Sequence, residues 1–489
     1  MLRFSPNPNL AHLIRWYEWE SEAFQKARAE DKPVMLFLSA FWCRYCQRMD
    51  EQAFSDRENM ALLNAYFIAL RAEDAMRPDI DARYNLNGWP TVGFFSPAGE
   101  LLGAVNFLAV EDFKNLLLNI YLAYREKKEQ ARLAPAPIGG IPRSHPAQAA
   151  EEAIVAEITG SIMTAADRTN GGYGRGQKFI HPWVNDFLLY RYETTKNSVY
   201  LDHVRLTLDR MRQGQIHDEE EGGYFRTTTG ADWSQPHREK LLVEQAGLLS
   251  NCLHVFRLTG RDEYARMAED IIEYLDNKLG DAGTGAFFGC EDFLRRETSD
   301  GELFSVIDRC IYSDANAVAA AAYLEASALL GRAGCKESAL RVLDFLWSRC
   351  RSADEGMCHY YDGEPRLPGM LRDQALVGTA MLDAYAGGGD AKYLEQAQEL
   401  AEVIIARLRN PGGGFHDRAM CDPEFLKSPL TDLDQNGAAA CFFSALARAL
   451  GTPEYADAAR WALDAARGHG AAYDMYAARF GRALGEFLG

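Results

Sequence analysis

The stretch Phe41-Trp42-Cys43-Arg44-Tyr45-Cys46 places two cysteines, separated by two residues, between two very different segments. Residues 33–39 before it form an apolar run with the length of a buried strand. Residues 47–54 after it are expected to form a helix. A cysteine at the start of a helix lies near free backbone amides and the positive end of the helix dipole, and both stabilise a thiolate. The stretch therefore indicates redox chemistry at Cys43 and Cys46.

The segments around this stretch alternate between helix and strand patterns. Helices are expected at residues 18–30, 56–65, 77–84 and 110–129. Strands are expected at residues 66–70, 91–95 and 100–106, in addition to 33–39. This order predicts an α/β domain, which we place at residues 1–130.

A Trp-Cys-x-x-Cys motif after the first core strand, with Trp89-Pro90-Thr91 before a hairpin, resembles a thioredoxin-like domain. The resemblance implies that Pro90 follows a cis peptide bond and packs beside the dithiol. Trp42 and Trp89 are then candidates for an apolar recognition surface at the site, with ordinary packing as the equal alternative.

Cys43 is the candidate attacking thiol, because the first cysteine of such a turn is the more exposed one and Arg44 adds positive charge beside it. Cys46, one helical turn later, would resolve the mixed disulfide. The central pair Arg44-Tyr45 differs from the Gly-Pro of ordinary thioredoxins, so a vestigial or regulatory dithiol is an alternative. A zinc site is another, but no second Cys/His pair with zinc spacing occurs in residues 1–130.

Four further stretches resemble one particular family. They are Ala11-His12-Leu13-Ile14-Arg15-Trp16, Arg77-Pro78-Asp79-Ile80-Asp81, Gly172 to Phe179, and Asp232 to Lys240. Together they are similar to the thioredoxin-domain family typified by spermatogenesis-associated protein, and the similarity extends along nearly the whole chain. The resemblance implies a thioredoxin-like domain joined to a helical toroid. This chain departs from the family pattern at Arg44-Tyr45, usually His-Trp, and at Arg238, usually Phe.

Residues 131–147 are rich in proline and glycine and are expected to form a linker. Beyond them helical patterns recur to the end, and no strand-rich run is expected. Glycine-rich aromatic turns recur with room for two helices between them, at residues 171–174, 222–225, 285–288, 356–360, 413–415 and 470–473. Twelve helices in six hairpins predict an all-α (α/α)6 toroid over residues 148–489.

Alternate helices of this toroid begin with a polar pair, which is unusual for helices expected to be on the inside. The pairs are Asn185/Asp186, Glu244/Gln245, Asp314/Asn316, Asp373/Gln374 and Asp434/Asn436. Helix capping explains such residues as well as cavity lining does. The candidates for lining a cavity at the toroid mouth are Asp186, Glu244, Asp314, Asn316, Asp373 and Asp434.

Trp233, His237 and His416 are further candidates for the toroid cavity, each with a structural role as the alternative. Paired carboxylates could hydrolyse a glycoside, whereas a pair of histidines could epimerise a sugar carbon by proton transfer. The toroid resembles those of N-acylglucosamine epimerases and unsaturated glucuronyl hydrolases. That resemblance concerns the fold and does not fix a reaction.

The composition disfavours some classes of binding partner and favours one cellular compartment. A formal net charge of −18 disfavours nucleic acid and anionic membranes as partners. The absence of a signal-peptide pattern, the absence of a long apolar run and the scattered cysteines favour the cytoplasm. No cofactor and no metal are expected, and the acidic residues 217–221 are expected to form a solvated loop.

These observations favour a two-domain protein that exchanges thiols and disulfides at Cys43 and Cys46. The expected partner is a protein thiol, a protein disulfide or a reductase, with the toroid binding or presenting the substrate. The first alternative is a carbohydrate-active enzyme, an epimerase or a hydrolase, with a carbohydrate ligand in the toroid. The second is a non-catalytic scaffold.

Overall fold

The computed structural model describes residues 2–86, 88–131, 151–295, 303–388, 390–419, 429–468 and 473–489. The chain divides into two compact units, one built mainly from the residues up to Pro142 and the other mainly from Arg143 onward. The expected linker falls, except for residue 131, outside the described residues, as do three positions of the expected turn at 470–473. Each unit is described by itself.

The first unit is built on a five-stranded mixed sheet with the strand order β1-β3-β2-β4-β5. Its strands are β1 (Trp16–Tyr17), β2 (Val34–Ser39), β3 (Ile68–Glu73), β4 (Thr91–Phe95) and β5 (Leu101–Val105). Strand β2 runs parallel to β3, with Leu36 opposite Leu70, and antiparallel to β4, with Leu36 opposite Gly93. Every residue of β2 is buried, as its continuous apolar run predicts for a central strand.

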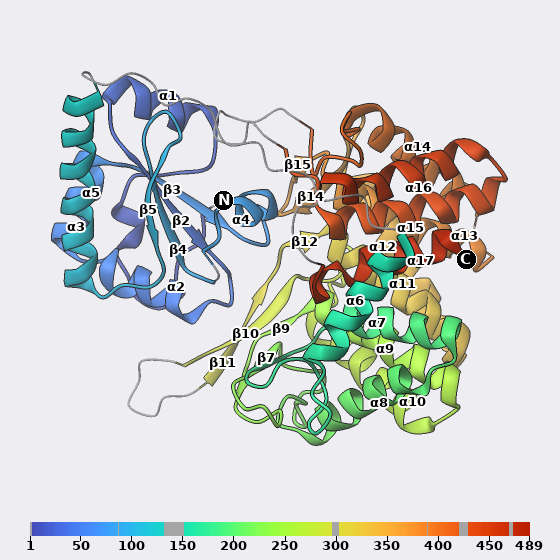
Figure 1. The fold of residues 1–489 in the computed structure, drawn as a ribbon. Helices are drawn as coiled ribbons and strands as arrows, with labels where there is room; N and C mark the ends of the chain where they lie inside the picture. The colour runs from blue at the N-terminus through green and yellow to red at the C-terminus, as the bar shows by residue number, and fades with distance from the viewer. Residues whose placement is uncertain are drawn as a thin grey trace. The chain divides into compact units, whose positions relative to one another are not determined.

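Helices cover both faces of this sheet (Figure 1). One face packs against α1 (Ser21–Glu30) and α4 (Pro78–Tyr84), and the other against α2 (Arg44–Arg48), α3 (Arg57–Tyr66) and α5 (Val110–Ala131). The side chains of β2 alternate between the two cores, because Met35 and Phe37 face one and Leu36 and Leu38 face the other. Both cysteines belong to the core that contains α2, α3 and α5.

The expected elements of this unit are all present, with shifted ends. Helix α1 begins at Ser21 rather than at residue 18, and it ends where Asp31 adopts a left-handed backbone conformation. Helix α3 begins after Asp56, whose carboxylate accepts hydrogen bonds from two backbone amides of the first turn. The helix after the cysteines is in two parts, because α2 continues into a π-helical turn at Met49–Ala53.

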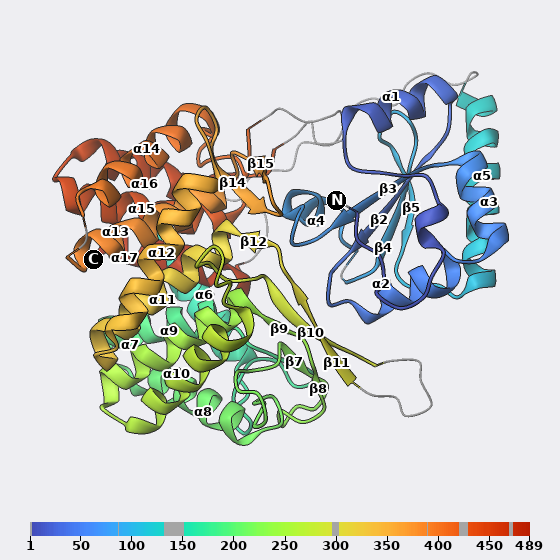
Figure 2. The ribbon, with the colours of Figure 1, turned by 180° about the vertical axis from the view of Figure 1, so that it is seen from behind.

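The second unit is a ring of helix pairs, which Figure 2 shows from behind. Its twelve α-helices within the described residues are α6 (Glu151–Ala165), α7 (Pro182–Thr195), α8 (Ser198–Gln213), α9 (Leu242–Thr259), α10 (Asp262–Tyr274), α11 (Ser313–Leu330), α12 (Ala333–Arg349), α13 (Leu371–Ala386), α14 (Lys392–Arg407), α15 (Leu433–Leu450), α16 (Pro453–Leu463) and α17 (Ala478–Leu488). Consecutive members of the series α7, α9, α11, α13, α15 and α17 pack on one another, and α17 packs on α7. These six helices therefore form the closed inner ring, with the others outside it.

The expectation that no strand-rich run follows the linker is wrong. The connections of the second unit contain several short sheets, of which the longest strands are β10 (Cys290–Arg295), β11 (Leu303–Asp308) and β14 (Gly356–Tyr361). Strand β14 pairs with β12 (Ile311–Tyr312), β13 (Arg351–Ser352) and β15 (Pro365–Pro368). These strands are excursions between helices, so they leave the toroid itself unchanged, but they contribute side chains to its mouth.

The amide members of the polar pairs anchor the recurring aromatic turns. The Asn316 side chain accepts the N–H of Phe287 at 2.8 Å and donates to the carbonyl of the same residue at 2.9 Å. Equivalent double contacts join Gln245 to Tyr224, Gln374 to Met357 and Asn436 to Phe415. Each amide thus takes the place of a strand neighbour for the backbone N–H and carbonyl of one buried residue. Asn316, predicted as a cavity residue, has this structural role.

Gly356 shows why glycine recurs in these turns. Its φ is 77°, and a Cβ at this position would lie 2.3 Å from the Oε1 atom of Gln374. A side chain would therefore both strain the backbone and displace the anchoring amide. The repeated pattern of glycine before an aromatic or apolar residue is a consequence of this close approach.

We expect replacement of Gln374 by methionine to destabilise the toroid, because methionine keeps the length but leaves the Met357 N–H without its partner and removes one of the two donors to the Met357 carbonyl, the other being the Gly369 N–H. The expected loss in the free energy of unfolding is about 1–3 kcal/mol for such buried polar groups. Urea denaturation followed by circular dichroism measures it. The control is Gln213→Met at the exposed end of α8, and an equal effect of both changes would contradict the anchoring role.

Candidate functional site

Cys43 and Cys46 are joined by a disulfide at the start of α2. Cys43 occupies the N-cap position, where its Sγ atom accepts the N–H of Cys46 at 3.1 Å. Cys43 is 5% exposed and Cys46 is 2% exposed, so Cys43 is the more accessible of two buried residues. A thiolate at Cys43 would receive this backbone hydrogen bond together with the favourable end of the helix dipole.

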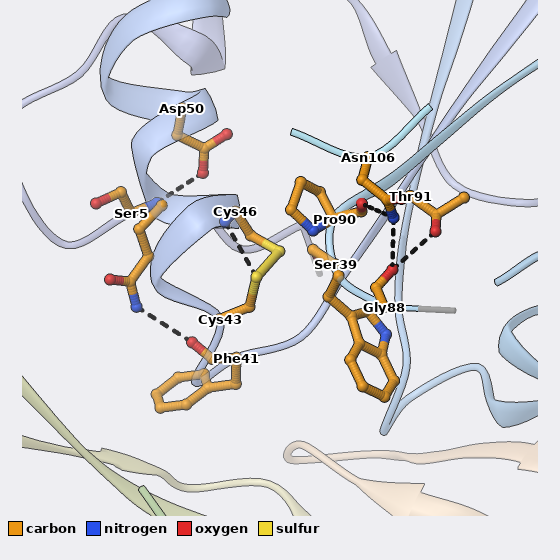
Figure 3. The surroundings of a disulfide bond; sticks show 12 residues. Ser5, Ser39, Phe41, Cys43, Cys46, Asp50, Gly88, Pro90, Thr91 and Asn106 are labelled. Carbon is orange, nitrogen blue, oxygen red and sulfur yellow. Dashed lines mark hydrogen bonds between the residues drawn. A yellow bond between two sulfur atoms is a disulfide. The ribbon is translucent and has the colours of Figure 1, made fainter. Parts of the chain in front are cut away.

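Pro90 lies in the surroundings of the disulfide, and the Trp89–Pro90 peptide bond is cis, as the resemblance implies (Figure 3). The loop that carries it is fixed by Asn106, whose side-chain amide donates to the carbonyls of Gly88 at 3.2 Å and Pro90 at 3.0 Å. The Thr91 hydroxyl donates to the Gly88 carbonyl at 2.8 Å. The position of Pro90 beside the cysteines therefore depends on side chains from β4 and from the residue after β5.

Trp42 and Trp89 form an edge-to-face pair with ring centroids 5.2 Å apart. The indole N–H of Trp89 donates to the carboxylate of Asp81 at 3.0 Å, and the amide of Asn85 donates to the same oxygen at 2.8 Å. Burial raises the pKa of Asp81. Helix α4 thus orients Trp89 through Asp81, which gives the Arg77-Pro78-Asp79-Ile80-Asp81 stretch a role in shaping the dithiol site.

A buried ion pair lies behind the dithiol helix. Asp50 and Arg71 form two hydrogen bonds of 2.7 and 2.8 Å, with side chains that are 1% and 6% exposed. The guanidinium also lies over the rings of Phe4 and Phe37, at 4.6 and 4.8 Å from the centroids. Because Asp50 follows Cys46 by one turn, the pair ties the dithiol helix to β3. Sequence reasoning missed both residues. An arginine within a buried strand nevertheless indicates a buried partner, because arginine is rarely buried unless it is paired.

Replacement of Arg71 by methionine should destabilise the first unit by about 3–5 kcal/mol, because the Asp50 carboxylate would stay buried without its partner. The double variant Asp50→Asn/Arg71→Met should be less destabilised than the sum of the two single changes. Urea denaturation curves of the four proteins give these values. The exposed Arg57→Met serves as the control, and additive effects would contradict the coupling.

The predicted carboxylates of the toroid are distributed over several ion pairs. Asp186 pairs with Arg482, Asp434 with Arg479 at 2.7 Å, and Asp314 with Arg372 at 2.8 Å. Glu244 differs, because its Oε2 atom is buried without a hydrogen-bond partner within the described ranges, and burial raises its pKa to about 8. The carboxylates therefore do not form a single ring.

Asp314 and Asp373 instead meet at one cluster with a histidine. His359, from β14, lies with its Nδ1 atom 3.0 Å from both carboxylate oxygens of Asp373. Burial raises the pKa of Asp373, whereas the neighbouring Arg372 charge lowers that of Asp314 against the effect of burial. Among the described residues this is the one set of three acidic or histidine side chains whose geometry could hold a metal ion, with ligand atoms within 4.8 Å. Sequence reasoning missed His359.

The remaining predicted toroid residues are in separate places. Trp233 is fully buried and donates its indole N–H to the Asn170 carbonyl at 2.7 Å, so it anchors a loop. His237 is exposed in the two-residue strand β8 (Pro236–His237), and His416 is half-buried with a pKa lowered by burial. Asp218 of the acidic stretch 217–221 accepts a hydrogen bond from the buried Lys240 at 2.7 Å. The contacts of Trp233 and Asp218 are structural, whereas the Nδ1 atom of His416 is buried without a hydrogen-bond partner within the described ranges.

A cavity of about 910 Å³ lies inside the helical ring and is lined by all six inner helices. Of the predicted carboxylates only Asp186 lines it. The other charged or histidine residues of the lining are Glu193, His254, Arg257, Glu325, Lys336, Asp383, Arg448, Arg479, Arg482 and Glu486. Most of them follow the first turns of the inner helices, so the cavity extends away from the predicted polar mouth.

Residues 8–136 match the family model described as Thioredox_DsbH, protein of unknown function, DUF255. The first unit carries a DUF255 domain. An uncharacterized protein of Caenorhabditis elegans is 28% identical over 317 residues, which cover 60% of this chain and 42% of that protein. Spermatogenesis-associated protein 20 of Mus musculus is 28% identical over 320 residues, which cover 60% of this chain and 40% of that protein. The resemblance to that family is confirmed, but the match covers 60% of this chain rather than nearly all of it, and it spans about two fifths of the length of these relatives.

A shorter match is to a thiol:disulfide interchange protein. The thiol:disulfide interchange protein DsbD 1 of Pseudomonas aeruginosa is 38% identical over 82 residues, covering 16% of this chain and 14% of that protein.

Solved structures share the fold of the toroid. D-mannose isomerase superposes with a TM-score of 0.55 at 14% identity, covering 71% of this chain and 99% of that one. Cellobiose 2-epimerase from Bacillus thermoamylovorans has a TM-score of 0.53 at 14% identity, covering 64% and 86%. At this identity the likeness shows the fold alone, and it confirms the (α/α)6 toroid. Within the described residues, no helix combines the length and apolarity needed to cross a membrane.

Proposed function

We propose that the chain is a thiol–disulfide oxidoreductase in which Cys43 attacks and Cys46 resolves. The observation that carries the proposal is the bonded pair at the start of α2, with Cys43 Sγ accepting the Cys46 N–H at 3.1 Å. The cis-proline in its surroundings and the match to a thiol:disulfide interchange protein support the same chemistry. The proposed compartment is the cytoplasm, where other reductants could return the pair to its reduced form.

In the reduced protein, the Cys43 thiolate would attack one sulfur of a partner disulfide and release the other as a thiolate. The Cys46 thiol would then lose its proton and attack the Cys43 sulfur of the mixed disulfide. This step breaks the intermolecular bond, forms the Cys43–Cys46 disulfide and leaves the partner fully reduced. A reduced dithiol protein would supply the two electrons for the next cycle.

The surface beside the dithiol offers a place for a protein partner. Tyr45, between the two cysteines, is 53% exposed, and its ring lies 5.3 Å from that of Phe107. The guanidinium of Arg48 lies 5.8 Å from the centroid of the same Phe107 ring. An aromatic surface next to a reactive sulfur suits an extended segment of a partner protein. We assign to the toroid the binding or presentation of this partner.

Reduced protein should catalyse the reduction of a model protein disulfide, such as that of insulin, by dithiothreitol. Cys43→Ser should abolish the activity, and Cys46→Ser should lose turnover but accumulate a mixed disulfide detectable by mass spectrometry. Cys335→Ala, at a buried cysteine of the outer helix α12, is the matched control and should retain full activity. Unchanged turnover in Cys43→Ser, or no turnover in the unaltered protein, would reject the proposal.

A second candidate function is carbohydrate chemistry at the mouth of the toroid. The specific observation is the cluster of Asp314, His359 and Asp373, because a histidine oriented by a carboxylate is a common arrangement for proton transfer. The Arg372 charge beside it could stabilise a developing negative charge. Both a sugar epimerase and a glycoside hydrolase remain candidates, since neither reaction is fixed by the fold.

A glycan and monosaccharide screen tests this second candidate on the full chain. At least one sugar should bind or turn over, and Asp314→Asn and Asp373→Asn should each lower the binding constant or the rate at least tenfold. Asp457→Asn, on the exposed face of outer helix α16, is the control. If no sugar responds, or if both variants act as the unaltered protein does, the mouth has no carbohydrate chemistry.

A further inference from the structure

The cavity within the ring reaches the C-terminal ends of the inner helices. Its lining includes residues from the last turn, or the residue just after it, of all six: Glu193 of α7, Arg257 of α9, Ala328 of α11, Gly387 after α13, Arg448 of α15 and Glu486 of α17. Carbonyl groups at helix ends carry partial negative charge and are not used within the helix. Several such ends around one cavity favour a positively charged occupant.

Most charged groups of the lining already have a partner. Arg482 is paired with Asp186 and Glu486, and Arg257 with Glu193. Arg479 is paired with Asp434, which does not line the cavity. Lys336 donates to the Gly387 carbonyl at 2.9 Å. Among the cationic side chains of the lining, only Arg448 has no ion pair or hydrogen bond within the described residues.

Glu325 and Asp383 differ from the other lining carboxylates. Neither forms an ion pair or hydrogen bond within the described ranges, and they lie on the neighbouring inner helices α11 and α13. Burial, together with the negative charges of Asp186 and Asp383, raises the pKa of Glu325 to about 7, and burial raises that of Asp383 to about 6. Asp383 is exposed and belongs to the cavity lining. Both carboxylates therefore lie in the cavity lining without a cation of the described residues in direct contact.

The walls around these carboxylates are small and apolar. They are formed by Ala317, Val318, Ala321, Leu324, Leu376 and Ala380. A divalent metal ion prefers about six to eight oxygen ligands at short range, which such walls do not supply. An organic ammonium group needs only three acceptors and brings an apolar chain that the alanines and leucines can contact.

We propose that this cavity binds a small organic cation, with an ammonium group held between Glu325 and Asp383. The site is separate from the dithiol and from the Asp314–His359–Asp373 cluster, and it stands independently of both candidate functions. The ligand class is a primary amine or diamine with a short aliphatic chain.

Isothermal titration calorimetry of the full chain with 1,4-diaminobutane at pH 8 and 150 mM salt tests the proposal. One equivalent should bind, and Glu325→Gln and Asp383→Asn should each weaken the binding at least tenfold. Both variants remove a repulsion rather than a contact, so their melting temperatures should not fall. Glu395→Gln on the exposed side of α14 should bind as the unaltered protein does. The ligand control is 1,4-butanediol, which has similar length and no charge and should give no heat of binding.

Three results would overturn the proposal. They are the absence of diamine binding, equal binding in the cavity variants and in the unaltered protein, and binding of calcium chloride in place of the amine with loss in the same variants. The last would assign the carboxylates to a metal ion instead of an organic cation.

Discussion

The toroid depends on one repeated interaction, in which a first-turn amide of an inner helix binds both the backbone N–H and the backbone carbonyl of a single residue. Asn316, Gln374 and Asn436 each accept the N–H and donate to the carbonyl of the aromatic or apolar residue that follows a glycine turn. A buried peptide group that is not in a helix or sheet needs such a partner. The amides thereby fix the long connections over the ends of the inner helices, and the carboxylates beside them are left to form ion pairs. In these polar pairs the amide therefore binds the backbone of a connection, and the carboxylate is available for an ion pair.

The dithiol site is likewise held in place by contacts between separate elements of the first unit. Cys43 and Cys46 are held by α2, but the approach to them is shaped by the cis-proline loop and by Asp81, which orients Trp89. The Asp50–Arg71 pair then fixes the helix to the central sheet. The redox proposal therefore rests on a site whose walls come from four separate elements of the unit.

Much of the fold was predictable because its signals are local. The run at residues 33–39 and the alternation of helix and strand patterns gave the first unit, and the glycine turns gave the ring of helix pairs. The site was less predictable, because its decisive contacts join distant residues. His359 lies in a strand that periodicity did not reveal and meets Asp373 only in the folded chain. Trp233 and Asn316 looked like cavity residues, yet each is used to anchor a loop. Glu325 and Asp383 lie within helices, and the sequence does not show whether a polar residue of such a helix faces a cavity or the solvent.

The closure of the ring has a consequence for the order in which the chain can fold. Helix α17 packs between α6, α7 and α15, and the ion pair between Arg482 and Asp186 joins residues 296 positions apart. Five hairpins can be assembled from neighbours in sequence, but the last inner helix must find partners from the beginning of the unit. The entropy lost in closing so large a loop grows only slowly with its length, whereas the search takes longer. During synthesis the inner surfaces of α7 and α15 therefore stay uncovered until α17 has left the ribosome, and in that interval they are exposed to aggregation.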